Sequence, residues 1–109
     1  MKSWRLNEID VAAQSPQVLD STYEGRAIVI QLSAGDSLAE HQVHERGWLT
    51  VAAGRIEVIA PDCERIAGGP GLLVEFDPNE RHAIVALEDS RLLLLLSPWP
   101  GEGHPGSPG

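Results

Sequence analysis

Short apolar segments alternate with turn residues along most of this chain. The segments are rich in Val, Ile and Leu, and Gly, Pro, Asn, Asp or Ser separate them at roughly ten-residue intervals, a spacing typical of short antiparallel strands. No segment repeats its apolar residues with a sustained helical period. The pattern therefore predicts an all-β fold with little or no helix, either a two-sheet sandwich or a jelly-roll barrel. The expected strands are residues 26–32, 38–43, 48–52, 55–60, 72–76, 82–87 and 91–96.

The segments around these strands carry more local predictions. The tight turn Ala53-Gly54 predicts a β-hairpin between residues 48–52 and 55–60. Residues 61–71 are rich in Gly and Pro and are expected to form a loop. The segment from Trp4 to Val11 alternates loosely between apolar and polar residues, so we expect an edge strand there.

Composition narrows the class of protein. The 109 residues are enough for one domain, and a hydrophobic content of 42% with few aromatic residues predicts an aliphatic core. A net charge of −8 argues against partners with anionic surfaces, namely nucleic acid and acidic membranes. The five leucines of Leu92–Leu96 are too few to cross a bilayer and fit a buried strand better.

The two ends of the chain and its one cysteine add expectations about context. The N-terminus has no apolar stretch of the signal-peptide kind, and Cys63 has no second cysteine to form an intrachain disulfide, so we expect a cytoplasmic protein. Residues 98–109 are rich in Pro and Gly and are expected to be a flexible tail, with Trp99 packing back on the barrel. Residues 1–97 then form a single barrel domain.

Three histidines in strand-like surroundings are the candidate chemistry. His41 and His44 lie in the first half of the chain, and His82 begins a later strand. Histidine is the commonest side-chain metal ligand, and separate strands often supply one ligand set. In a regular strand His41 and Val43 would face the interior and His44 would face outward, whereas a bulge or early turn at Gln42-Val43 would rotate His44 inward.

These stretches resemble the two motifs of the cupin superfamily, which are small jelly-roll barrels. Gly35, followed after five residues by His41, matches the opening of the first motif, and Gly54 lies thirteen residues after His41 as that motif requires. Residues 77–82, Asp-Pro-Asn-Glu-Arg-His, resemble the Pro-x-Gly-x-x-His turn of the second motif, with His82 kept. Asn79 stands in the place of its glycine, which is reasonable because Asn tolerates positive φ.

The resemblance covers about residues 26–97 and implies an antiparallel jelly-roll barrel of the cupin type, a double-stranded β-helix. It also implies a set of four metal ligands, of which this chain keeps His41 and His82 in register. Val43 stands at the place of the second histidine and Gly47 at that of the glutamate. With His44 turned inward, His41, His44 and His82 would hold one divalent Zn, Fe, Mn or Ni ion, and Glu45 or Glu80 could add an oxygen ligand. The alternative is a pocket that has lost its metal.

These observations lead to one functional hypothesis and two alternatives. The first is a small-molecule binding protein that holds its ligand in the barrel mouth, with or without a divalent metal. The alternatives are a metal-dependent enzyme of the oxygenase or isomerase type and a structural or partner-binding barrel. The sequence assigns no catalytic residue and gives no sign of a nucleotide cofactor. The resemblance further implies a homodimer, which would cover exposed strand edges.

Overall fold

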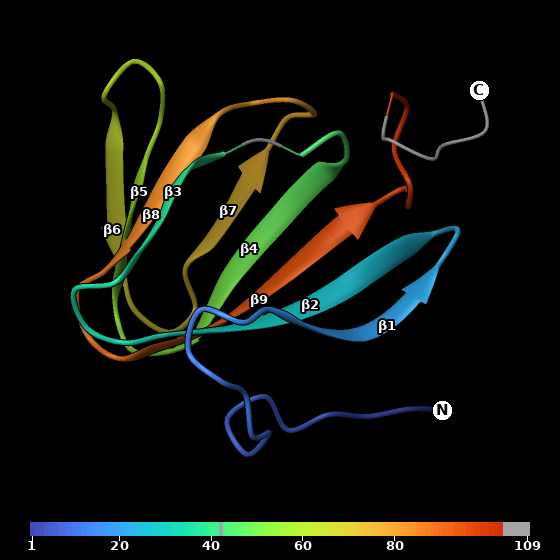
Figure 1. Ribbon diagram of the computed structural model, residues 1–109, viewed down its shortest axis with the longest axis horizontal. Coiled ribbons are helices and arrows are strands. Elements are labelled where there is room, and N and C mark those ends of the chain that lie inside the picture. Colours follow the sequence, from blue (N-terminus) through green and yellow to red (C-terminus); the bar gives the residue numbers. More distant parts are fainter. Residues whose placement is uncertain (42, 104–109) are drawn as a thin grey trace.

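The computed structural model describes residues 1–41 and 43–103, and the side chains of all of these except residues 39–41. The residues described form nine β-strands, which make two sheets facing each other (Figure 1). The strands are β1 (Gln17–Thr22), β2 (Gly25–Leu32), β3 (Ser37–His41), β4 (Arg46–Ala53), β5 (Ile56–Ile59), β6 (Arg65–Gly68), β7 (Leu73–Phe76), β8 (His82–Ala86) and β9 (Ser90–Ser97).

The two sheets confirm the predicted fold class. One sheet has five strands in the order β1-β2-β9-β4-β7, and the other has four in the order β3-β8-β5-β6. Every pairing of strands within them is antiparallel. The part of the chain that the structure describes contains no helix, and hence none long and apolar enough to span a membrane.

The core lies between the sheets and follows from the alternation of each strand. On β4, Gly47, Leu49 and Val51 are buried while the residues between them are less so, and on β8 the buried positions are His82, Ile84 and Ala86. Successive side chains of a strand point to opposite faces, so one residue in two enters the core. As predicted, the buried cluster is aliphatic apart from one phenylalanine. Its members are Ile30, Leu32, Leu49, Val51, Ile56, Val58, Phe76, Ile84, Ala86 and Leu92.

The predicted hairpin between the third and fourth expected strands is wrong. β4 pairs with β7 and β9, whereas β5 pairs with β6 and β8, so the turn between them carries the chain from one sheet to the other. Gly54 lies at this crossing with φ +88°, and a Cβ there would lie 2.2 Å from the carbonyl oxygen of Asp89. A tight turn is a local signal, but the partner of each strand is decided by packing across the barrel.

Two smaller predictions also need correction. The loop predicted for residues 61–71 contains β6, a short and largely exposed edge strand that pairs with β5. The segment 4–11 contains no strand. Instead it crosses the outer face of the five-stranded sheet, where Arg91 Nη1 donates to the carbonyl oxygens of Leu6 at 2.5 Å and Ile9 at 2.7 Å. Hydrogen bonds from the Arg91 side chain on β9 therefore hold this segment, in place of the backbone hydrogen bonds that an edge strand would make.

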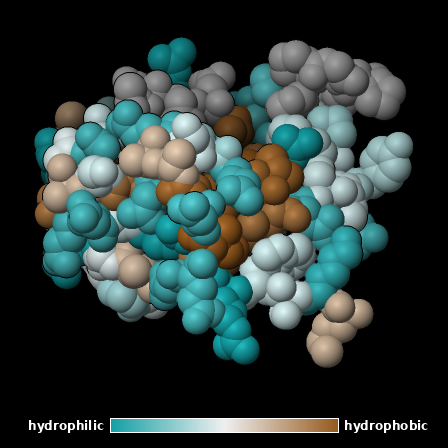
Figure 2. Space-filling view, turned by 60° about the horizontal axis from the view of Figure 1, so that its bottom comes forward, coloured by the Kyte–Doolittle hydropathy of each residue, from teal (hydrophilic) through white to brown (hydrophobic). Residues whose placement is uncertain are grey.

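The outer face of the five-stranded sheet is partly apolar. A shallow groove of about 380 Å³ lies there, and its apolar lining includes Trp4, Ala27, Trp48 and Leu95. Figure 2 shows hydrophobic residues gathered on one face of the molecule with hydrophilic residues around them. Exposed apolar area of this kind suits an interface between proteins. The homodimer implied by the family resemblance stays a prediction.

Candidate functional site

Three connections meet at one end of the barrel, the upper end in Figure 1: the β3–β4 corner, the β7–β8 turn and the segment that follows β9. We call this end the mouth. β3 ends at His41 and β4 begins at Arg46. The predicted bulge or early turn at Gln42-Val43 includes Gln42, which lies outside the described residues, so the inward rotation of His44 stays a prediction. Glu45 immediately precedes β4, and only 1% of it is exposed.

The β7–β8 turn is tied to the β3–β4 corner by its backbone. Asn79 adopts φ 65°, the left-handed conformation expected of a residue that stands in the place of the motif's glycine. Its N–H donates to the carbonyl oxygen of Val43 at 2.7 Å. Within the turn, the backbone N–H of Asp77 donates to Glu80 Oε1 at 3.1 Å. The two loops therefore hold each other in place across the mouth.

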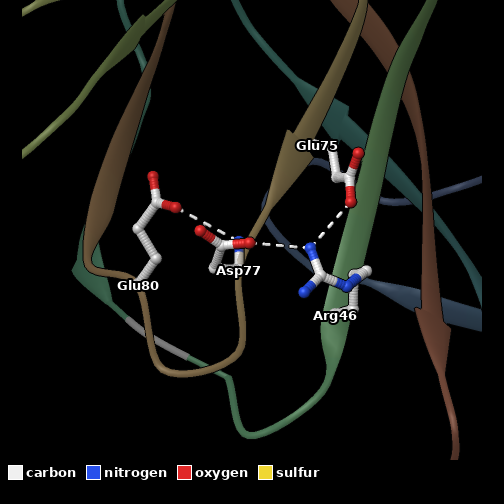
Figure 3. Close-up of polar contacts among 4 residues, drawn as sticks. All are labelled: Arg46, Glu75, Asp77 and Glu80. Carbon is white, nitrogen blue, oxygen red and sulfur yellow. Dashed lines mark hydrogen bonds and ion pairs between the residues drawn. The ribbon is translucent and has the colours of Figure 1, made fainter.

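Arg46 adds an ion-pair network on the outer side of the mouth. Its Nη1 lies 2.7 Å from Glu75 Oε2 and 2.7 Å from Asp77 Oδ1, so the guanidinium sits between the two carboxylates (Figure 3). The hydrogen bonds to Asp77 and then to Glu75 raise the pKa of Arg46 above its ordinary value. Because all three side chains are substantially exposed, water and salt screen this network, and its main effect is to fix the start of β4 against the end of β7.

His82 occupies the inner side of the mouth. It is 4% exposed, and its ring stacks on Phe76 with centroids 3.7 Å apart and an interplanar angle of 7°. Its Nδ1 lies 3.3 Å from the carbonyl oxygen of Glu80. A carbonyl oxygen can only accept, so this contact favours the tautomer with hydrogen on Nδ1 and the lone pair on Nε2. The ring is thus held rigidly, in one orientation.

The segment after β9 closes the outer part of the mouth. The backbone N–H of Gly101 donates to Glu45 Oε2 at 2.7 Å. Between this segment and the two loops lies a cavity of about 400 Å³, which we call the mouth cavity. Its lining combines imidazole, guanidinium, amide and carboxylate groups with prolines and a glycine. The lining residues are His44, Arg46, Pro78, Asn79, Ser97, Pro98, Gly101 and Glu102.

The predicted metal ligands lie in different surroundings. His44 lines the mouth cavity, while His82 lines two smaller cavities of about 130 and 180 Å³. The backbones of His41 and His82 are direct partners in the β3–β8 ladder, but the side chain of His41 lies outside the described residues. Among the side chains that are described, no three His, Cys, Asp or Glu residues are close enough together to hold a metal ion. The set His41, His44 and His82 therefore stays a prediction.

The sequence did not point to residues 98–103 as part of the site. Trp99 packs back as predicted, with the Arg26 guanidinium carbon 3.8 Å from its ring centroid. Gly101 is buried at the mouth, although nothing in a Pro/Gly-rich stretch distinguishes a packed glycine from a solvated one. The prediction that residues 98–109 are flexible stays a prediction, and residues 104–109 lie outside the described residues.

Comparison with known proteins supports the fold alone. No family model matches the sequence, and no curated protein matches it significantly. An RmlC-like cupin from Desulfovibrio desulfuricans superposes with a TM-score of 0.81 at 18% identity, over 90% of this chain and 97% of that one. A double-stranded β-helix protein from Klebsiella pneumoniae gives 0.77 at 17% identity, over 89% and 84%.

A third structure, KdgF from Halomonas sp., gives a TM-score of 0.72 at 24% identity, over 84% of this chain and 90% of that one. These likenesses extend over nearly the whole length of each protein. They agree with the two-sheet antiparallel topology. This chain therefore has the cupin fold, the double-stranded β-helix of the RmlC-like cupins.

Proposed function

We propose that this protein binds a small polar organic molecule in the mouth cavity. The observation that carries the proposal is the cavity itself, about 400 Å³ in volume and walled by three segments that hydrogen bonds hold together. Ligand sites in proteins typically measure about 300–1,000 Å³ and are largely formed before the ligand arrives. Cupin neighbours are consistent with a small-molecule binder or an enzyme, and the cavity suits the binding of a small molecule by either.

The lining indicates the chemistry of the ligand. His44 can donate or accept a hydrogen bond, Asn79 can do both, and Glu102 accepts. The Arg46 guanidinium already engages Glu75 and Asp77, so the positive charge at the cavity is largely balanced. Prolines supply apolar walls between these groups. A compact ligand with several hydroxyl or amide groups matches this mixture better than a long hydrocarbon or a polyanion.

A ligand screen tests the proposal directly. The purified protein is scanned by thermal shift against small sugars, hydroxy acids and amides, and hits are measured by calorimetry. Glu102→Ala and His44→Ala are then compared with Glu88→Ala, a change at an exposed acid on the β8–β9 turn away from the mouth. The mouth variants should weaken the hit by about 10-fold, since each removes a hydrogen-bonding group from the cavity wall. Equal affinity in all variants would place the ligand elsewhere.

Metal-assisted chemistry is the second candidate, favoured by the direct cross-strand pairing of the His41 and His82 backbones. Neighbouring β-carbons at such positions lie about 5 Å apart. A metal held by His41 and His82, with His44 or Glu45 completing the set, would supply a Lewis acid to a bound ligand. The described side chains do not by themselves provide three ligands, so this candidate depends on His41.

Elemental analysis distinguishes the two candidates. The protein is purified without added metal, then dialysed against Zn²⁺, Fe²⁺, Mn²⁺ or Ni²⁺ and assayed for bound metal. The metal candidate requires about one ion per chain that is lost in the double variant His41→Ala/His82→Ala. If the wild-type protein retains no ion under any of these conditions, the metal-dependent enzyme is excluded and the metal-free binding site stands.

A further inference from the structure

The hydrogen bond between Glu45 and Gly101 joins positions that are 56 residues apart in the chain. Glu45 is 1% exposed, and a carboxylate so deeply buried is costly unless hydrogen bonds compensate the loss of water. A backbone N–H that donates to a carboxylate forms a short, charge-assisted bond of the stronger kind. The 2.7 Å separation is of that length. The buried Glu45 carboxylate is therefore a specific hydrogen-bonding position for the segment after β9.

Gly101 can approach Glu45 this closely because it has no side chain. A Cβ at this position would lie 2.7 Å from the carbonyl oxygen of His44 and 3.1 Å from the Cα of Glu45. Both are backbone atoms, which cannot move aside as the end of a side chain can. The backbone of the segment therefore packs directly on the backbone of the β3–β4 corner, and any larger residue would lift it off.

The same segment has a second anchor two to four residues earlier in the chain. Ser97 Oγ donates to the carbonyl oxygen of Glu24 at 2.6 Å, and the Trp99 N–H donates to that of Tyr23 at 3.3 Å. The Trp99 ring lies against the Arg26 guanidinium. The segment is thus fixed at the β1–β2 turn by residues 97–99 and at the mouth by Gly101. Release of Gly101 would leave the contacts of residues 97–99 intact and free only the residues beyond them.

From this arrangement we infer that residues 100–103 form a latch over the mouth cavity, closed by the Gly101–Glu45 hydrogen bond. The segment supplies Gly101 and Glu102 to the cavity wall, and Gly103 lies close to His44, with its Cβ position 3.7 Å from His44 Nδ1. Opening the latch would remove one wall and expose His44. The inference rests on the proposed function only in taking this cavity as the ligand site.

Two measurements that need no ligand test the latch. The first is amide exchange in the wild-type protein, which compares the Gly101 amide with the Gly103 amide by NMR. The second is the rate at which diethyl pyrocarbonate modifies His44, followed by mass spectrometry, with the buried His82 as internal control. Gly101→Ala and Glu45→Ala should open the latch. Glu45→Gln keeps an oxygen acceptor and should preserve it. Gly47→Ala is the matched glycine control, because its nearest neighbours would lie at an ordinary 3.6 Å.

We expect the wild-type Gly101 amide to exchange about 10-fold to 100-fold more slowly than that of Gly103. Modification of His44 should accelerate about 10-fold in Gly101→Ala and Glu45→Ala, while His82 keeps its wild-type rate. Equal exchange of the two glycine amides in the wild-type protein would overturn the inference, whether or not the variants fold. An unchanged rate of His44 modification in both Gly101→Ala and Glu45→Ala would also overturn it.

A ligand from the screen separates this inference from the proposed function. If the latch is real and the cavity is the site, Gly101→Ala should raise the ligand's dissociation rate while Gly47→Ala does not. A working latch with no ligand in the screen would refute the proposed function alone. A ligand that binds the mouth in a protein whose Gly101 amide is unprotected would refute the latch alone.

Discussion

Replacement of Gly54 by alanine should destabilise this barrel far more than the same change at Gly35. The two glycines have the same φ of +88°, so an alanine pays the same backbone penalty at both positions. They differ in their surroundings. A Cβ at Gly54 would lie 2.2 Å from the carbonyl oxygen of Asp89 and 2.4 Å from Ser90 Oγ, whereas nothing lies within 4 Å of a Cβ at Gly35.

The magnitude follows from two terms. The left-handed conformation costs a non-glycine residue about 1–2 kcal/mol, and alanine recovers roughly 0.5–1 kcal/mol by restricting the unfolded chain. Both apply equally to Gly35→Ala, which should lose about 1 kcal/mol or less. At Gly54 the overlap with two fixed neighbours adds about 1–3 kcal/mol, as overpacking does in other cores. We therefore expect Gly54→Ala to lose about 1–4 kcal/mol, which is about 1–3 kcal/mol more than Gly35→Ala.

Urea unfolding, followed by circular dichroism, provides the measurement. With a slope of about 1.5 kcal/mol per molar urea for a domain of this size, Gly35→Ala should shift the midpoint by about 0.7 M or less, and Gly54→Ala should shift it by about 0.7–2 M more than that. Equal shifts in the two variants would show that the close approach of Gly54 to the β8–β9 turn is not what requires glycine there. A changed slope would mean that the unfolded state had been altered instead.

Three further predictions concern single contacts. Ser90→Ala should cost about 1–3 kcal/mol in urea unfolding, because the fully buried Oγ donates to the Glu88 carbonyl oxygen at 2.7 Å and accepts from the Arg55 N–H at 3.1 Å; an unchanged midpoint would contradict this. Asn79→Val should lower the melting temperature and Asn79→Gly should not, since valine tolerates φ 65° poorly; the reverse order would refute the turn geometry. In a double-mutant cycle, Arg46→Met and Asp77→Asn should show coupling that disappears in high salt, and coupling that survives high salt would mean a buried pair.

Much of the fold could be predicted from the sequence because a strand's face is a local property. A side chain enters the core or faces water according to its place in a two-residue period, so the runs at residues 26–32, 82–87 and 91–96 identify buried strands without any knowledge of their partners. Turn chemistry is equally local. Asn79 aligns with the glycine of the second motif and has a side chain that tolerates positive φ, and it adopts φ 65°.

The sequence by itself therefore determined the all-β class, most of the strands, the aliphatic core and the resemblance of Gly35, His41, Gly54 and His82 to the cupin motifs. Only the tertiary structure decided which strand pairs with which, since β4 and β5 lie in different sheets although a tight turn joins them. It also decided the candidate site. His44 and His82 face different cavities, and Gly101 reaches Glu45 across 56 residues. The two-residue period of apolar positions shows which side chains of a strand are buried, whereas contacts between distant segments depend on the closure of the whole barrel.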